Sequence, residues 1–230
     1  MRIGAVIAAA GRGQRMGTEV NKQYLALAGR PILARTLDVF YNYPRVEEIN
    51  VVVACQDKEY CRQNIIEEYN FQTVKLVAGG KTRRESVFTG LKAFSPAIDY
   101  VIIHDGARPL LKEELLHRII CSLDENDAVS AGVPVKDTIK FRDEEGFVEK
   151  TPHRKRLTAI QTPQAFALNL ILKAHQSISL SEEISDDASL VEKLGGRVKI
   201  IEGDYENLKV TTPVDLILAR AILNRREQER

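Results

Sequence analysis

Cysteine is scarce in this chain, with three cysteines among 230 residues. Cys55, Cys61 and Cys121 are odd in number, and none pairs with another at the short spacing of a metal site. A disulfide framework needs paired cysteines, and a structural zinc site needs clustered ones. The sequence argues against both, and we interpret the three cysteines as packing or incidental residues.

Net charge and long apolar runs are also missing. The chain has 33 Lys and Arg against 32 Asp and Glu, a formal net charge of +1. This balance gives no broad basic surface, so we expect no nucleic-acid and no membrane partner, but a small anionic ligand at a locally positive site. No apolar run is long enough to cross a bilayer, and Gly11, Arg12 and Arg15 interrupt the amino-terminal run too early for a signal peptide. We therefore expect a cytoplasmic protein.

The apolar pattern predicts an α/β fold in a single domain, residues 1–230. Helix-length amphipathic segments separate short apolar runs, which implies βαβ units, a mainly parallel sheet and helices on both faces. Ligands of such Rossmann-like folds bind at the carboxyl ends of the strands. The predicted strands begin at Ile3 (IGAVIA), Ile49 (INVVVA), Thr73 (TVKLV), Tyr100 (YVIIHD) and Ala128 (AVSAGVPV).

Residues 137–156 break the βα alternation. Their sequence, DTIKFRDEEGFVEKTPHRKR, predicts two strands joined by an acidic turn at Gly146, and thus a projecting β-hairpin arm. A two-stranded ribbon is marginally stable alone, so we expect this arm to pack against a second copy of the chain.

A glycine loop follows the first predicted strand and carries two cations, Arg15 and Lys22. Gly11 and Gly13 let the backbone approach a phosphate closely, and the cations can neutralise its charge. Met16 stands where the dinucleotide fingerprint has its third glycine, and no Gly-Lys-Ser/Thr follows, so the loop is neither that fingerprint nor a P-loop. We interpret it as a phosphate-binding loop of another kind.

Two further motifs lie where predicted strands end. In VAGGKTRRESVFTGL, Gly80 and Ser86 suit either contacts to a nucleotide base or an ordinary turn with a helix cap. In HDGARPLL, Asp105 suits Mg²⁺ held between triphosphate oxygens, while an internal ion pair between Asp105 and Arg108 is the alternative. We interpret His104 as structural or orienting.

The remaining candidates lie further along the chain. Thr138 and Arg154 flank the hairpin, either near its base, at a neighbour's site, or simply in solvent. Asp186 and Asp187 begin a predicted helix, where capping is at least as natural as catalysis. Lys209 is expected on a short strand before a capped helix, where we favour a phosphate contact.

In order along the chain, seven motifs together resemble the 2-C-methyl-D-erythritol 4-phosphate cytidylyltransferase family of the non-mevalonate isoprenoid pathway. The resemblance runs from about Ile3 to Leu223. Ribitol-5-phosphate cytidylyltransferases share several of the motifs, whereas VPVKDTIK and DDASLVE favour the erythritol-phosphate branch. The seven are AAGRGQRMGTEVNKQYL, VAGGKTRRESV, HDGARP, VPVKDTIK, TPQAF, DDASLVE and ENLKVTTPVDL.

This resemblance implies a role for each matching residue. The transition-state cations fall on Arg15 and Lys22, and Asp105 falls near the metal, Mg²⁺ or another divalent cation. Cytidine contacts fall near Ala9, Ala10, Gly80 and Ser86, and the backbone of Gly11 and Gly13 wraps the triphosphate. Substrate-positioning residues fall on Arg108, Thr138, Arg154, Thr162 and Lys209, with Arg154 supplied by the partner's arm in a homodimer. Lys81 departs from the family, which can have an acidic residue there.

The resemblance also implies a reaction. A phosphate oxygen of the sugar-alcohol phosphate attacks the α-phosphorus of CTP in line, and pyrophosphate leaves without a covalent enzyme intermediate or a general base. The alternative enzyme is a cytidylyltransferase for ribitol 5-phosphate or another polyol phosphate. A nucleotide-binding regulatory module is disfavoured because Arg15, Lys22, Asp105 and Lys209 occur together, and a dehydrogenase is disfavoured by Met16.

Overall fold

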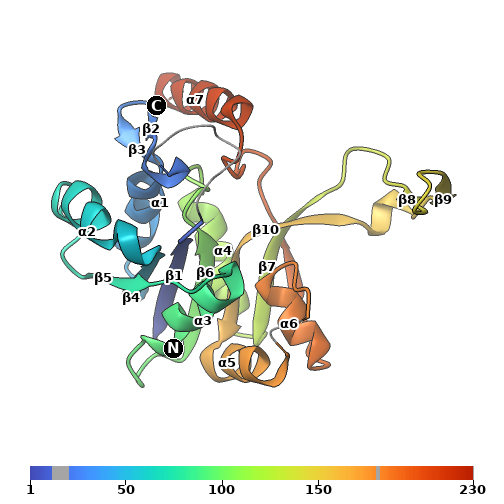
Figure 1. Cartoon of the computed structure of the whole chain (residues 1–230), viewed down its shortest axis with the longest axis horizontal. Helices are drawn as coiled ribbons and strands as arrows, with labels where there is room; N and C mark the ends of the chain where they lie inside the picture. Colours follow the sequence, from blue (N-terminus) through green and yellow to red (C-terminus); the bar gives the residue numbers. More distant parts are fainter. Residues whose placement is uncertain (12–20, 180–181, 230) are drawn as a thin grey trace.

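A central seven-stranded sheet organises the computed structural model, which describes residues 1–11, 21–179 and 182–229 (Figure 1). The strand order is β11-β7-β10-β6-β1-β4-β5. All neighbours are parallel except β10, which runs antiparallel to both β6 and β7. The strands are β1 (Ile3–Ala9), β4 (Val46–Val53), β5 (Val74–Ala78), β6 (Tyr100–Asp105), β7 (Ala128–Pro134), β10 (Thr158–Ala167) and β11 (Lys199–Glu202). The predicted mainly parallel α/β sheet and its five predicted strands are confirmed.

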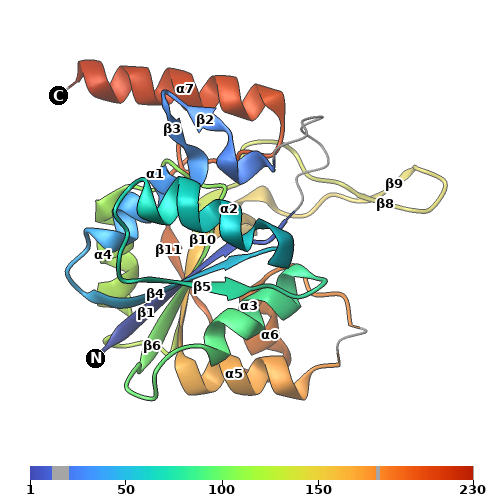
Figure 2. The ribbon, with the colours of Figure 1, turned by 60° about the vertical axis from the view of Figure 1, so that its left-hand side comes forward.

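Helices cover both faces of the sheet, as the continuous apolar strands predicted (Figure 2). Along β1, Ile3, Ala5 and Ile7 point into one buried cluster, and Val6 points into the other. The first face carries α1 (Ile32–Tyr41), α2 (Lys58–Cys61), the π-helix η4 (Arg62–Glu67) and α4 (Glu113–Ser122). The second face carries α3 (Arg83–Lys92), α5 (Leu168–Ser177) and α6 (Asp187–Lys193).

A third, smaller apolar cluster holds the carboxyl-terminal helix α7 (Pro213–Gln228) over the rest of the domain. Thr212 and Asp215 form a reciprocal capping box at its start. The cluster joins α7 to the short strands β2 (Ala26–Leu27) and β3 (Arg30–Pro31), which follow the 3₁₀ turn η2 (Lys22–Tyr24). This packing places the chain segment before α7 beside the ends of β1 and β6.

A thin ribbon projects from the body between β7 and β10 (Figure 1). Its strands β8 (Phe141–Arg142) and β9 (Val148–Lys150) pair antiparallel, and Gly146 has the positive φ of +94° that the turn requires. Phe141 and Phe147 are 53% and 68% exposed, so in one chain the ribbon buries little apolar surface. The 3₁₀ turns η3 (Cys55–Asp57) and η5 (Arg154–Arg156) complete the structure.

His104 ties β6 to its neighbours inside the core. Its ring is fully buried and lies 5.2 Å from the ring of Phe40. Because Nε2 lies 3.2 Å from the carbonyl oxygen of Arg108, Nε2 carries the proton, and Nδ1 accepts from the Thr162 hydroxyl at 3.1 Å. Burial lowers the pKa of His104 to about 4. The neutral ring therefore fits the orienting role that the sequence suggested.

This buried histidine predicts a loss of stability in mild acid. The unfolded chain has the ordinary histidine pKa of about 6.5, so it takes up a proton first as the pH falls. The contribution of His104 is complete above pH 6.5 and is lost between that pH and about 4, a change of up to about 3 kcal/mol. Urea unfolding at several pH values, with NMR titration of the His104 ring, measures both effects. An imidazolium at position 104 in the folded protein at pH 6 contradicts the assignment.

Candidate active site

A cavity of about 780 Å³ opens where β1, β5 and β6 end. This volume is typical of sites for small molecules. Its floor includes Asp105 at the end of β6, and its walls include the residues after β1 and β5 and the first turn of α3. Eight residues predicted for the site line it together: Ala9, Ala10, Gly11, Lys22, Gly80, Ser86, Asp105 and Lys209. Predicted site residues Gly13 and Arg15 lie outside the described residues.

The end of β1 is fixed by the segment that returns from the glycine loop. Gln23, which is 2% exposed, donates from Nε2 to the carbonyl oxygen of Ala9 at 2.8 Å. Lys22 precedes it in η2 and therefore lies at the cavity wall. A side chain at Gly11 would meet no atom of the described residues within 4 Å.

The start of α3 has the turn and helix cap that were one of the two interpretations of the Gly80 and Ser86 motif. The Ser86 hydroxyl accepts from the Gly80 amide at 3.1 Å and donates to the Thr82 carbonyl at 2.8 Å. A Cβ on Gly80 would lie 2.5 Å from Cβ of Glu85, so only glycine fits. Glu85 accepts from the Lys81 amide at 2.7 Å, which brings a carboxylate beside Lys81. The turn is thus capped and also forms a cavity wall.

Three cations surround the Asp105 carboxylate, which is 8% exposed. Lys209 Nζ lies 2.8 Å, Arg83 Nε 3.4 Å and Arg108 Nε 3.5 Å from its oxygens. Burial alone would raise the pKa of this carboxyl, but the charges of Arg83, Lys209 and Arg108 hold it well below the usual range. The predicted ion pair of Asp105 with Arg108 is present, and the cluster also carries a surplus of positive charge beside the cavity.

Lys209 reaches this cluster from irregular chain, not from the expected short strand. The segment before α7 makes one backbone hydrogen bond to the loop after β6, from Val210 N to Ala107 O at 2.8 Å, and no ladder. Arg108 donates to the Asn207 carbonyl at 2.7 Å, which secures the same segment. The strand prediction was wrong because one such contact does not make a sheet pair.

Thr162 supports Asp105 from β10. Its hydroxyl accepts from the backbone amide of Asp105 at 3.1 Å and donates to His104. Its side chain is 5% exposed and is not among the cavity walls. The structure therefore places this predicted positioning residue under the site, where it orients the strand end that carries Asp105.

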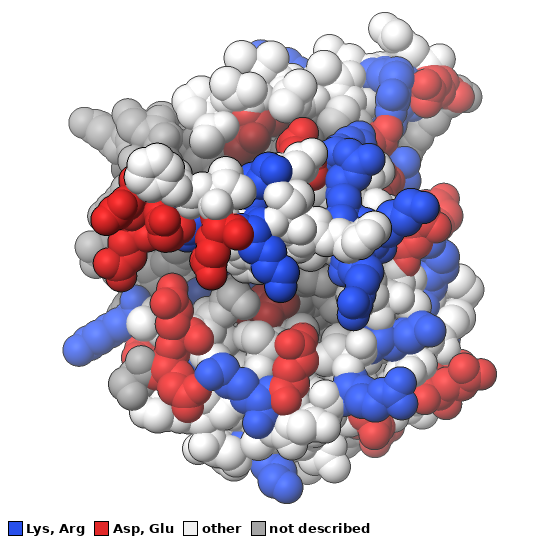
Figure 3. All heavy atoms as spheres, turned by 90° about the vertical axis from the view of Figure 1, so that its right-hand side faces the viewer, with Lys and Arg blue, Asp and Glu red and all other residues white. Residues whose placement is uncertain are grey.

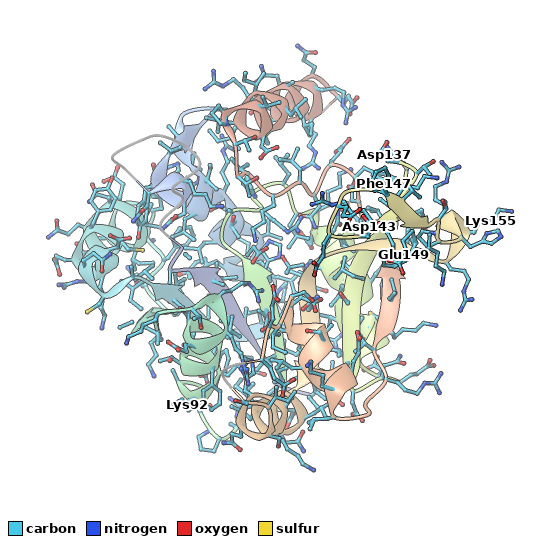
Figure 4. The ribbon with its side chains drawn as sticks, turned by 45° about the vertical axis from the view of Figure 1, so that its right-hand side comes forward. Lys92, Asp137, Asp143, Phe147, Glu149 and Lys155 are labelled. Carbon is cyan, nitrogen blue, oxygen red and sulfur yellow. The ribbon has the colours of Figure 1, made fainter. Side chains whose placement is uncertain are left out.

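The structure does not bring Thr138 and Arg154 to the cavity of the same chain. Both belong to the arm, where Arg154 Nη1 donates to the Lys136 carbonyl at 2.8 Å. The arm projects away from the body of the domain in Figure 1, and Figure 4 labels Phe147 and Lys155 on it. Figure 3 views that side of the molecule and shows Lys and Arg side chains gathered beside a group of Asp and Glu side chains.

Sequence reasoning did not assign Arg83 to the site, although its motif was identified. Arg83 lines the cavity and joins Asp105 to Asp187 of α6, with Nη1 2.8 Å from Asp187 Oδ2. The capping alternative holds for Asp186, which accepts from the Ser189 amide at 3.0 Å. Two arginines in the first turn of a helix beside a glycine pair were the available signal. Sequence alone does not show which arginine faces the site.

Two kinds of feature are absent from the described residues, namely a membrane-spanning helix and a cluster of metal-binding side chains. No helix there is long and apolar enough to cross a membrane. No group of three or more His, Cys, Asp and Glu side chains is placed to hold a metal ion in those same ranges.

Comparison with known proteins places the chain in a family. Residues 3–225 match the model of 2-C-methyl-D-erythritol 4-phosphate cytidylyltransferase. The proteins of that name from Geobacter metallireducens and Syntrophotalea carbinolica are 45% identical over 228 residues and 47% identical over 229 residues. These alignments cover 97% of this chain in both cases, and 98% and 97% of the relatives.

Solved structures agree over nearly the whole chain. The 4-diphosphocytidyl-2C-methyl-D-erythritol synthase from Anaerococcus prevotii superposes with a TM-score of 0.87 at 36% identity and covers 97% of this chain and 96% of its own. The 2-C-methyl-D-erythritol 4-phosphate cytidylyltransferase from Thermus thermophilus has a TM-score of 0.80 at 30% identity and covers 97% and 100%. The chain belongs to the 2-C-methyl-D-erythritol 4-phosphate cytidylyltransferase family.

Proposed function

We propose that this chain transfers CMP from CTP to 2-C-methyl-D-erythritol 4-phosphate and releases pyrophosphate. Membership of the family makes the chain a cytidylyltransferase. The observation that carries the mechanism is the surplus of positive charge at the site. Arg83, Arg108 and Lys209 surround Asp105, and Lys22 and Lys81 also line the cavity, whereas the described residues of the site add two further carboxylates, Glu85 and Asp187. Both substrates are polyanions, and such a surplus offsets their mutual repulsion. The alternative acceptor, ribitol 5-phosphate, is not favoured, because the relatives are 2-C-methyl-D-erythritol 4-phosphate cytidylyltransferases.

The reaction needs position and charge more than acid or base catalysis. A phosphate oxygen of the acceptor attacks the α-phosphorus of CTP, the bond from that phosphorus to the bridging oxygen breaks, and pyrophosphate leaves. The attacking oxygen is already anionic at neutral pH, so no base has to remove its proton. The buried, neutral His104, whose two ring nitrogens are used in hydrogen bonds, is consistent with this.

We assign the nucleotide to the cavity walls after β1 and β5. Contacts to cytidine come from Ala9, Ala10, Gly80 and Ser86, and the glycines of the loop, Gly11 and Gly13, follow the triphosphate. Arg15 and Lys22 meet the charge that grows at the α-phosphorus. This assignment is supported by the residues of the set that the structure describes, all of which line one cavity of suitable volume. They are Ala9, Ala10, Gly11, Lys22, Gly80 and Ser86.

Asp105 is the residue that fits Mg²⁺ or another divalent cation. Its carboxyl is ionised because its pKa is depressed, and it lines the cavity. One protein carboxylate suits Mg²⁺, which keeps several waters and takes further ligands from substrate phosphates. When bound, the ion supplies Lewis-acid stabilisation of phosphate charge. Lys209 and Arg83, which line the cavity, can then contact phosphate oxygens in place of Asp105.

We further infer that residues 137–156 form a dimerisation arm on the domain formed by residues 1–230. Exposed apolar side chains on this ribbon, Ile139, Phe141, Phe147 and Val148, support a partner surface. In a homodimer with arm exchange, Thr138 and Arg154 position the sugar phosphate in the partner's site, while Arg108, Thr162 and Lys209 act within the same chain. We place this reaction in the cytoplasm, as the sequence led us to expect.

The first test measures pyrophosphate release with Mg²⁺ across a panel of nucleoside triphosphates and polyol phosphates. The expected result is fast release only with CTP and 2-C-methyl-D-erythritol 4-phosphate together. Omission of either substrate is the control for hydrolysis. A preference for ribitol 5-phosphate would overturn the acceptor, and CTP binding without turnover would overturn the enzymatic assignment.

Removal of a transition-state cation tests the mechanism. We expect Arg15→Ala and Lys22→Ala to lower kcat by on the order of 10²-fold while the protein stays folded, as for other electrostatic groups directed at a transition state. Steady-state kinetics and circular dichroism give the two readouts. Unchanged turnover in both variants would contradict the assigned roles.

The same Lys22→Ala variant tests arm exchange. Arg154→Ala is expected mainly to weaken binding of the sugar phosphate. If the arm acts across the dimer, a mixture of the two impaired variants forms some sites with both an intact Lys22 and a partner's intact Arg154. The mixture then regains part of the activity. Mass spectrometry first verifies that the subunits have exchanged. If the exchanged mixture then recovers no activity, the result contradicts this geometry.

A further inference from the structure

We propose that Arg83 binds a phosphate oxygen of a substrate, and that Asp187 is the positioning residue that holds the Arg83 guanidinium in place. The proposal rests on the proposed function, because the phosphate belongs to one of that reaction's substrates. It adds two residues that the family resemblance did not assign. It also gives a role to the DDASLVE motif, for which the sequence allowed both helix capping and catalysis.

The guanidinium of Arg83 stands at the cavity with two of its three nitrogens engaged. Nε lies 3.4 Å from Asp105 Oδ1, and Nη1 lies 2.8 Å from Asp187 Oδ2. The third nitrogen, Nη2, has no hydrogen bond or ion pair with the described residues that line this region. The side chain is 35% exposed and lines the cavity. One N–H edge of the fork is therefore available to an anionic oxygen, the ligand that its geometry suits.

Asp187 pairs with Arg83 and is buried away from solvent. Its side chain is 2% exposed at the start of α6, and it is not among the described residues that line the cavity. Asp187 also lies close to His175, whose Nε2 is 3.7 Å from Asp187 Oδ1. Burial lowers the pKa of His175 to about 4, and its ring stacks on Phe88 at 5.3 Å, so it is neutral at pH 7. Within the described part of the chain, Arg83 is the cation that balances Asp187.

A buried carboxylate without a partner is strongly unfavourable, so Asp187 keeps the guanidinium at this position. Asp105, by contrast, shares its charge among three cations and faces the cavity. If substrate or a metal ion draws Asp105 away, Arg83 loses only one of its two carboxylate partners. Asp187 thus prepares a fixed positive group before the reaction, the arrangement that makes electrostatic stabilisation effective.

A purely structural pair is the competing interpretation. The ion pair joins α3 to α6, and that link alone would explain its burial. The two interpretations differ for a double variant in which both charges are removed. A structural pair predicts that stability and activity return together once the buried charge is neutralised. A phosphate-binding Arg83 predicts that stability returns and activity does not.

The experiment compares Arg83→Gln, Asp187→Asn and the double variant, with Glu192→Gln as a control on the exposed face of α6. For each protein, kcat, the KM of CTP, the KM of the acceptor and the urea midpoint are measured. We expect kcat/KM to fall by about 10²-fold in Arg83→Gln and by roughly tenfold in Asp187→Asn. The double variant should regain stability over Arg83→Gln while its kcat/KM stays within about threefold of that variant.

The kinetic constants also separate the two phosphate sources. A raised KM for CTP assigns Arg83 to the triphosphate, a raised KM for the acceptor assigns it to the phosphomonoester, and a lowered kcat alone assigns it to the phosphorus under attack. Near wild-type activity in the double variant, or in a folded Asp187→Asn, would overturn the proposal. Failure of the unmodified protein to turn over CTP would instead reject the proposed function.

Discussion

The site depends on one interaction, the buried carboxylate of Asp105 among three cations. Arg83 comes from α3, Arg108 from the loop after β6 and Lys209 from the segment before α7. These elements are far apart in sequence, and the carboxylate joins all of them at one strand end. A buried charge requires such partners, and the partners in turn define where the cavity wall lies.

The same arrangement explains how a chain with almost no net charge binds two polyanions. The formal net charge is +1, yet the positive groups at the cavity outnumber its central carboxylate. Surface ion pairs, such as those of Glu206 with Lys112 and Arg226, balance charge elsewhere without contributing to the site. The potential is therefore local, and substrate phosphates are expected to replace Asp105 as partners of the surrounding cations.

Much of this site could be predicted because parallel strands place their carboxyl ends at one edge. The ends of β1, β5 and β6 were recognisable as apolar runs, so Ala9, Gly80 and Asp105 were expected together. The antiparallel β10 was missed because its TPQAF segment lacks a long apolar run. The pair of Arg83 and Asp187 was missed because it joins helices 104 positions apart, a contact that no local pattern encodes.

The central claim is that the cations around Asp105 exchange this carboxylate for substrate phosphates. A crystal structure of the protein with CTP and Mg²⁺ tests it most directly. The account predicts triphosphate oxygens within about 3 Å of Lys22 and of at least one cation that now contacts Asp105, the distance of a charge-assisted hydrogen bond. A triphosphate bound elsewhere, with Lys209, Arg83 and Arg108 still paired only to carboxylates, would contradict it.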